Sequence, residues 1–266
     1  MICRNENATT MKTYQIIFLL VLFSCTEPDG TTNSSENIVE APLSGQSEKS
    51  NDVKAEIPVV ESLGPEIFEG LVDIRSYNTD IYVDLKYASE DNFMGFPLYE
   101  RMKRAYLQPD VARRLNYCQI YLSALDTSLH LLVYDAARPV SVQKMMWEAL
   151  DTVPPAIRGK YVSNPANLSL HNMGCAVDLT ICNAEGIALD MGAGYDDFRD
   201  IAFPKKEAKY LKSGKLTKEQ HDNRLLLRKV MASQKFRQLP TEWWHYNAYS
   251  REVARRMFKA LEVEPY

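Results

Sequence analysis

Two short stretches, far apart in the chain, restrict its fold more than any other feature of the sequence. The first carries His171 and Asp178 with Gly174 between them, and the second carries Glu242 and His245. Imidazole and carboxylate groups together suit zinc. Gly174 permits a tight turn, which would let a histidine before a strand converge with an aspartate on that strand. A fold that uses these side chains together has to bring both stretches to one place.

The second stretch sets a condition of its own. Residues 242–247 are expected to form a strand, on which positions three apart point to opposite faces. Glu242 and His245 can therefore serve one site only if the chain bends between them. Two histidines, one aspartate and an open fourth position would make a catalytic zinc centre. A nearby glutamate that does not bind the metal would then be the general base.

Taken singly, these residues have simpler explanations. A lone histidine is more often a core or surface residue than a metal ligand, and Trp243 and Trp244 alone indicate core packing. The other two histidines, His130 and His221, stand in no comparable motif. The two stretches together favour the metal site over core packing.

The N-terminal part of the chain is expected to be a targeting segment outside the folded domain. The apolar run 16–23 follows a lysine and precedes a serine and Cys25, which is the order of an export signal. Residues 22–25 resemble a bacterial lipobox. The resemblance implies that residues 1–25 are a lipoprotein signal peptide with its lipobox and that Cys25 is lipidated.

The remainder is expected to be a flexible tether followed by one domain. Residues 26–57 are polar and poor in large apolar side chains, so they cannot offset their ordering entropy by burial. Residues 58–266 are predicted to fold, since the chain is 45% hydrophobic and 25% charged. A formal net charge of −4 offers no basic excess for nucleic acid. No apolar run reaches the roughly 18 residues that cross a bilayer.

The three cysteines of this domain are expected to be buried free thiols. Cys118, Cys175 and Cys182 show no CxxC spacing. In an exported protein, a disulfide between two of them remains the alternative.

Hydrophobic periodicity and capping residues predict helices and strands in irregular order. The expected helices cover 111–125, the stretch after Pro139 to about residue 150, 217–233 and 250–261. The expected strands cover 130–135, 175–181 and 242–247. Ser141 is a plausible cap of the second helix, and Thr217 with Gln220 forms a capping-box pattern at the start of the third. Because strands and helices do not alternate regularly, an α+β fold is favoured over a doubly wound sheet.

Five stretches in order resemble a known family. The pattern Ser-x-His-x-x-Gly-x-Ala-x-Asp at 169–178 and Glu-x-x-His at 242–245 resemble zinc peptidases that cut D-alanyl peptides of the bacterial cell wall. Residues 84–95, 135–139 and 190–198 narrow the resemblance to the D-alanyl-D-alanine dipeptidases, the group that includes the vancomycin-resistance dipeptidase. The resemblance runs from about Leu71 to the C-terminus.

The resemblance implies a fold and a role for each matching residue. The fold would be the zinc D,D-peptidase/Hedgehog-like one, with a small central antiparallel sheet and flanking helices. One Zn²⁺ per chain would be bound by His171, Asp178 and His245, with Glu242 as the catalytic base. Arg138 would stabilise the oxyanion. The positions that the family uses around the substrate are Tyr87, Ser169 and Asp196, and Asp196 is a sensible partner for a free ammonium group.

The activity implied is zinc-dependent hydrolysis of the D-alanyl-D-alanine dipeptide, in cell-wall turnover or in glycopeptide resistance. Two alternatives remain: a D,D- or L,D-carboxypeptidase acting on longer peptidoglycan peptides, and a non-catalytic peptidoglycan-binding lipoprotein. The expected partner is a small D-amino-acid dipeptide, without nucleic acid, and with membrane contact only through the lipid anchor. The protein is expected to be exported and anchored to the cell envelope, with its catalytic domain in the periplasm.

Overall fold

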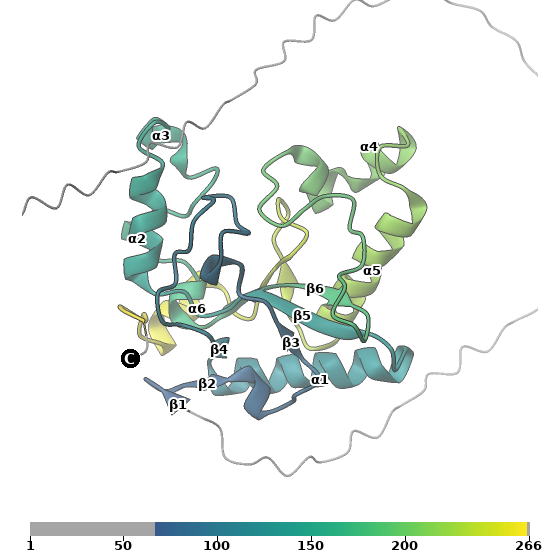
Figure 1. Cartoon of the computed structure of the whole chain (residues 1–266), viewed down its shortest axis with the longest axis horizontal. Helices are drawn as coiled ribbons and strands as arrows, with labels where there is room; N and C mark the ends of the chain where they lie inside the picture. Colours follow the sequence, from purple (N-terminus) through teal and green to yellow (C-terminus); the bar gives the residue numbers. More distant parts are fainter. Residues whose placement is uncertain (1–66, 265–266) are drawn as a thin grey trace, which may run out of the picture. The chain divides into compact units, whose positions relative to one another are not determined.

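The computed structural model describes residues 67–264 (Figure 1). The predicted signal peptide, Cys25 and the tether lie outside the described residues, and so does the predicted start of the domain. Within residues 67–264, no helix is both long and apolar enough to cross a membrane.

A five-stranded sheet built around β5 (His130–Asp135) and β6 (Ala176–Cys182) forms the centre of the domain. Its order is β3-β5-β6-β8-β7, with β3 (Tyr82–Val83) and β7 (Arg237–Gln238) at the two edges and β8 (His245–Asn247) between β6 and β7. The pairs β5–β6, β6–β8 and β8–β7 are antiparallel as predicted, whereas the β3–β5 pair at one edge is parallel and departs from that prediction. Every residue of β6 is buried, so both faces of this strand are covered.

A second, antiparallel sheet has the order β1-β2-β4. Its strands are β1 (Ile67–Phe68), β2 (Leu71–Asp73) and β4 (Tyr106–Leu107). The helices of the described residues are α1 (Pro109–Leu125), α2 (Val140–Ala149), α3 (Pro155–Arg158), α4 (Glu207–Lys212), α5 (Lys218–Ser233) and α6 (Arg251–Met257). Two sheets with helices in irregular order confirm the α+β fold class.

The elements with strong local signals form where the sequence places them. Helix α1 buries the predicted stripe, which includes Val111, Leu115, Cys118 and Leu122, and it packs against both α5 and β5. In Figure 1, α1 lies along one side of the central sheet. The capping box of α5 is complete, because Thr217 and Gln220 each accept the other's backbone N–H.

The predicted cap of α2 is wrong. Pro139 occupies the N-cap position, and Ser141 is already the second helical residue. The backbone N–H of Ser141 donates to the carbonyl of Glu262 at 3.1 Å. The C-terminal segment therefore supplies the acceptor that a capping side chain would otherwise provide.

The last helix is shorter than predicted. Ser250 is the N-cap of α6, so the helix begins where it was predicted, but it ends at Met257 and not at Leu261. The backbone of Leu261 pairs instead with distant groups, donating to the carbonyl of Asn172 at 2.6 Å and accepting from the N–H of Val140 at 2.8 Å. Tertiary hydrogen bonds have replaced the helical ones.

All three cysteines of the described part are buried and free, as predicted. Burial raises the pKa of the Cys118 and Cys175 thiols to about 12. These thiols are core residues without nucleophilic character at neutral pH.

Candidate metal centre and active site

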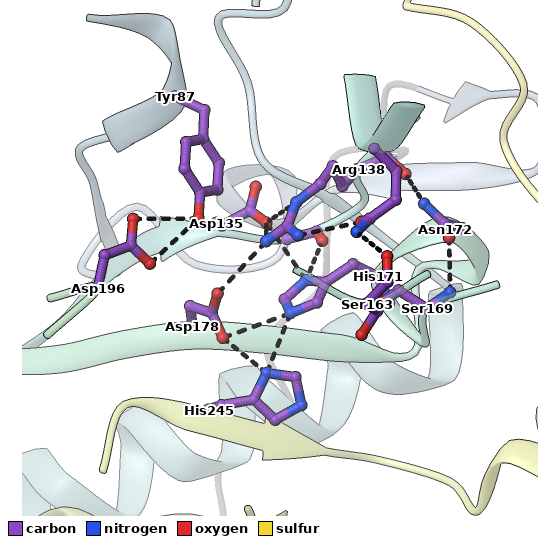
Figure 2. A network of polar contacts seen from close by, with 12 residues as sticks. Tyr87, Asp135, Arg138, Ser163, Ser169, His171, Asn172, Asp178, Asp196 and His245 are labelled. Carbon is purple, nitrogen blue, oxygen red and sulfur yellow. Dashed lines mark hydrogen bonds and ion pairs between the residues drawn. The ribbon is translucent and has the colours of Figure 1, made fainter. Parts of the chain in front are cut away.

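Three buried side chains from three separate elements meet at one point (Figure 2). His171 opens a short 3-10 helix, Asp178 lies in β6 and His245 begins β8. One ligand atom from each lies within 4.8 Å of the others. The register of β6 and β8 places Asp178 directly opposite His245, and their nearest atoms, Oδ1 and Nδ1, are 2.9 Å apart. The predicted ligand set is therefore assembled by sheet pairing.

Hydrogen bonds behind the two histidines decide which ring nitrogen faces the cluster. His171 Nδ1 lies 2.7 Å from the carbonyl oxygen of Ala136, and His245 Nε2 lies 2.9 Å from Oδ1 of Asn247. Both partners are acceptors, so these nitrogens carry the protons. The inner nitrogens, His171 Nε2 and His245 Nδ1, lie 3.1 Å apart, and with the protons on the outer nitrogens their lone pairs would be available to a metal ion.

This donor set fits a zinc ion. Two imidazole lone pairs and one carboxylate converge in a buried site, which is a zinc ligand set with a further position left for substrate or water. Although burial opposes ionisation of Asp178, the two histidines lower its pKa below the ordinary value. Asp178 is thus held as the anion that a cation would require.

Gly174 makes the approach of His171 to β6 possible. It ends the 3-10 helix with φ of +62°, a left-handed conformation that favours glycine. A Cβ atom there would lie 2.7 Å from Cδ2 of Leu71 and 3.1 Å from the backbone nitrogen of Gln108. Conformation and close packing both require glycine at this turn.

Glu242 satisfies the condition that the sequence set for it. The strand β8 starts only at His245, and a bend at Trp243 and Trp244 separates it from Glu242, so the expected strand over 242–247 is wrong in its first half. Glu242 Oε2 lies 3.8 Å from His245 Nδ1. Burial raises the pKa of Glu242, although a third of its side chain (34%) stays exposed. The carboxylate stands beside the metal ligands as a base would.

Arg138 is held rigidly beside the cluster. Its Nε and Nη2 donate to Oδ2 of Asp135 at 3.0 and 2.7 Å, and its Nη1 donates to Gln143 at 3.1 Å. Nη2 also lies 3.7 Å from Oδ2 of Asp178. Although burial opposes the charged form, Asp135 raises the pKa of Arg138 well above its ordinary value. The guanidinium is therefore a permanent positive charge in a buried position, with its side chain 9% exposed.

The predicted substrate residues lie on two sides of the cluster, as Figure 2 shows. On one side, the hydroxyl of Tyr87 donates to Asp196 at 3.2 Å. Burial, together with the nearby Asp178, raises the pKa of Asp196 well above its ordinary value. On the other side, the hydroxyl of Ser169 accepts from the backbone N–H of His171 at 3.3 Å. Among residues 67–264, Asp196 forms no ion pair with a lysine or arginine, and Arg138 stabilises its charge only from a distance.

A cavity of about 180 Å³ connects these groups. All eight residues predicted for the site in the domain line it: Tyr87, Arg138, Ser169, His171, Asp178, Asp196, Glu242 and His245. The structure thus places the residues together, while the individual roles remain predictions.

Three supporting residues were not identified from the sequence. Asp135 orients Arg138, Asn247 fixes the proton on His245, and the hydroxyl of Tyr195 donates to Oδ2 of Asp178 at 3.1 Å. The sequence could have indicated Asn247, because it lies two residues after His245 on a predicted strand and therefore shares a face with it. No sequence pattern indicated that Tyr195 would contact Asp178, since this contact exists only in the folded chain.

Comparisons with known proteins agree with this geometry. The profile of the D-ala-D-ala dipeptidase family matches residues 68–262. The D-alanyl-D-alanine dipeptidase of Escherichia coli is 32% identical over 180 residues, covering 66% of this chain and 83% of the relative. That of Enterococcus faecalis is 32% identical over 178 residues, covering 61% and 83%, and that of Synechocystis is 25% identical over 176 residues, covering 56% and 71%.

Proposed function

Because this chain belongs to the D-Ala-D-Ala dipeptidase family, we propose that it is a zinc metallopeptidase that hydrolyses the D-alanyl-D-alanine dipeptide. The observation that carries the proposal is the shared cavity, in which a complete zinc ligand set, a candidate base and a buried arginine meet a carboxylate suited to an ammonium group. The family and the relatives support the same activity.

The chemistry can be assigned to the chain's own groups. Zinc held by His171, Asp178 and His245 would supply Lewis acidity and make a water molecule more acidic. Glu242 takes the proton of the attacking water and passes it to the nitrogen of the departing D-alanine. Arg138 stabilises the negative charge that develops on the scissile carbonyl oxygen, and it needs no reorganisation because Asp135 already orients it.

Asp196 favours the dipeptidase over the carboxypeptidase alternative. Its buried carboxylate has the hydroxyl of Tyr87 as a neutral donor, and the ammonium group of a free dipeptide would supply the missing positive charge. The acylated nitrogen of a longer peptide would leave this carboxylate unpaired. We therefore expect selectivity for a free N-terminus.

The test is the release of D-alanine from D-Ala-D-Ala and from its N-acetylated form, each with and without a zinc chelator. Chelator-sensitive cleavage of the free dipeptide alone would support the proposal. Cleavage of the acetylated form would assign the protein to the carboxypeptidases. Folded, zinc-loaded protein that binds peptides without cleaving them would favour the non-catalytic peptidoglycan-binding lipoprotein.

We further propose that the domain works outside the cytoplasm, attached to the cell envelope through a lipid on Cys25. The export-signal order and the lipobox-like residues 22–25 support this location. An exported enzyme cannot reach the cytoplasmic dipeptide pool, so turnover of released peptidoglycan fragments fits better than glycopeptide resistance. Mass spectrometry of the N-terminal peptide from membrane and cytosolic fractions tests the location. Cytosolic protein with unmodified Cys25 would contradict it.

A further inference from the structure

The active-site cavity contains a cation that the proposed mechanism does not use. Arg251, the first residue of α6, lines the cavity together with Ser169 and Asn247. Helix α6 lies on the Ser169 side of the site. Ala254 packs with the neighbouring Leu170 in one small apolar cluster.

Helix stability does not explain a positive charge at this position. Arg251 stands in the first turn of α6, where the helix dipole disfavours cations. The other charged residues of α6 suit the helix dipole, since Glu252 lies in the first turn and Arg255 and Arg256 lie in the last. Within the described residues 67–264, the exposed guanidinium of Arg251 takes part in no hydrogen bond or ion pair, whereas Arg255 on the same helix donates to the carbonyl of Asn167.

The charged side chains of the cavity lie at different positions around the metal ligands. Asp196 lies on one side of the metal ligands and Ser169 on the other (Figure 2). Arg138 is already committed to Asp135 and Gln143. Among the described residues that line the cavity, and apart from the two histidine ligands, Arg251 is the remaining side chain that carries positive charge.

We infer that Arg251 pairs with the C-terminal carboxylate of the dipeptide, as a specificity-determining residue opposite Asp196. The inference rests on the proposed function, since it requires a zwitterionic dipeptide in this cavity. A guanidinium suits this role because its planar fork can donate two parallel hydrogen bonds to a carboxylate. With Asp196 holding the ammonium group, the two charged ends would define a substrate of two residues.

The experiment compares two substrates that differ only in this charge, D-Ala-D-Ala and D-alanyl-D-alaninamide. We expect R251Q to lower kcat/KM for the free acid about ten- to one-hundredfold, mainly through KM. For the amide, kcat/KM should stay within about twofold of wild type, because the amide carries no charge for Arg251 to pair with. R251K should retain part of the preference for the acid.

Arg256→Gln is the matched control, because it removes an exposed arginine from the last turn of the same helix. It should leave both substrates at wild-type rates. A loss in R251Q that is equal for acid and amide, or no loss at all, would overturn the inference while leaving the proposed function intact. Wild-type protein that cleaves neither substrate would contradict the proposed function and the inference together.

Discussion

Arg138 donates two hydrogen bonds to a single carboxylate oxygen, Oδ2 of Asp135, at 3.0 and 2.7 Å. The other oxygen of Asp135 accepts from the hydroxyl of Tyr99 at 2.5 Å. The side chain of Asp135 is fully buried and that of Arg138 is 9% exposed. Asp135 therefore both compensates the charge of Arg138 and fixes its direction in the cavity.

Asp135→Asn should impair both stability and catalysis. It removes the nearest counter-charge of the buried guanidinium and leaves only Asp178 at 3.7 Å, which costs up to about 3–5 kcal/mol of unfolding free energy. The value of kcat should fall at least about tenfold because Arg138 loses its orientation. Denaturant unfolding and steady-state kinetics check the two effects. Tyr99→Phe, which removes only the hydroxyl from Asp135, should cost about 1 kcal/mol. Equal effects of the two substitutions would contradict the role of Asp135.

Asn247→Ala should weaken zinc binding without removing a ligand. The amide oxygen of Asn247 holds the proton on Nε2 of His245, so its loss frees the ring to turn and to change tautomer. A decrease of about 10–100-fold in zinc affinity is expected, as for other residues that support metal ligands. Competition with a chromogenic chelator measures it. Unchanged affinity would show that the strand alone orients His245.

Removal of zinc should abolish activity and lower thermal stability together. A metal that binds only the folded chain stabilises it by mass action, and the three ligands join β6, β8 and the turn before β6. Dialysis against a chelator should therefore lower the melting temperature, and zinc should restore both properties. Magnesium should not restore them, because it prefers oxygen ligands in octahedral geometry.

Asp196→Asn should reduce activity on the free dipeptide while keeping the fold. The neutral amide cannot pair with an ammonium group, and it also removes the need to bury a charge, so stability should stay equal or rise. We expect kcat/KM for D-Ala-D-Ala to fall by at least about tenfold, measured as D-alanine release. The ratio of activity on N-acetyl-D-Ala-D-Ala to that on the free dipeptide should rise. A constant ratio would exclude Asp196 as the amine partner.

Gly174→Ala should be more disruptive than Gly214→Ala, although both glycines have similar positive φ, +62° and +71°. A Cβ atom at Gly214 meets nothing within 4 Å, so this substitution carries only backbone strain, about 1 kcal/mol. At Gly174 the contact with Leu71 adds to that strain and displaces the turn that carries His171. Chemical denaturation and zinc titration of both variants should separate the two contributions.

The sequence predicted best where the signal is local or chemical. The capping box at Thr217 and the apolar stripe of α1 depend on neighbours within a few residues, and both formed as expected. The metal ligands were also identifiable, because the two stretches at 169–178 and 242–245 occur together and resemble the motifs of a zinc peptidase family. The prediction for Glu242 and His245 was conditional on a bend, and the structure contains that bend.

The sequence did not predict helix ends whose backbone groups form hydrogen bonds with residues far away in the chain. The role of Ser141 was mispredicted because its backbone N–H donates to the carbonyl of Glu262. The end of α6 was mispredicted because the backbone of Leu261 pairs with Asn172 and Val140. These hydrogen-bond partners lie far away in the sequence, so no local sequence pattern indicates them.

The sequence by itself therefore determined the kind of domain and the ligand types of its centre, since composition, periodicity and side-chain chemistry are carried by the residues themselves. Only the tertiary structure decided how these groups are used. The pairing of β6 with β8 sets Asp178 against His245, and the carbonyl of Ala136 selects the tautomer of His171. The packing of α6 brings Arg251 to the cavity. Distances and protonation states of this kind depend on groups far apart in the chain, and they come into existence only when the chain folds.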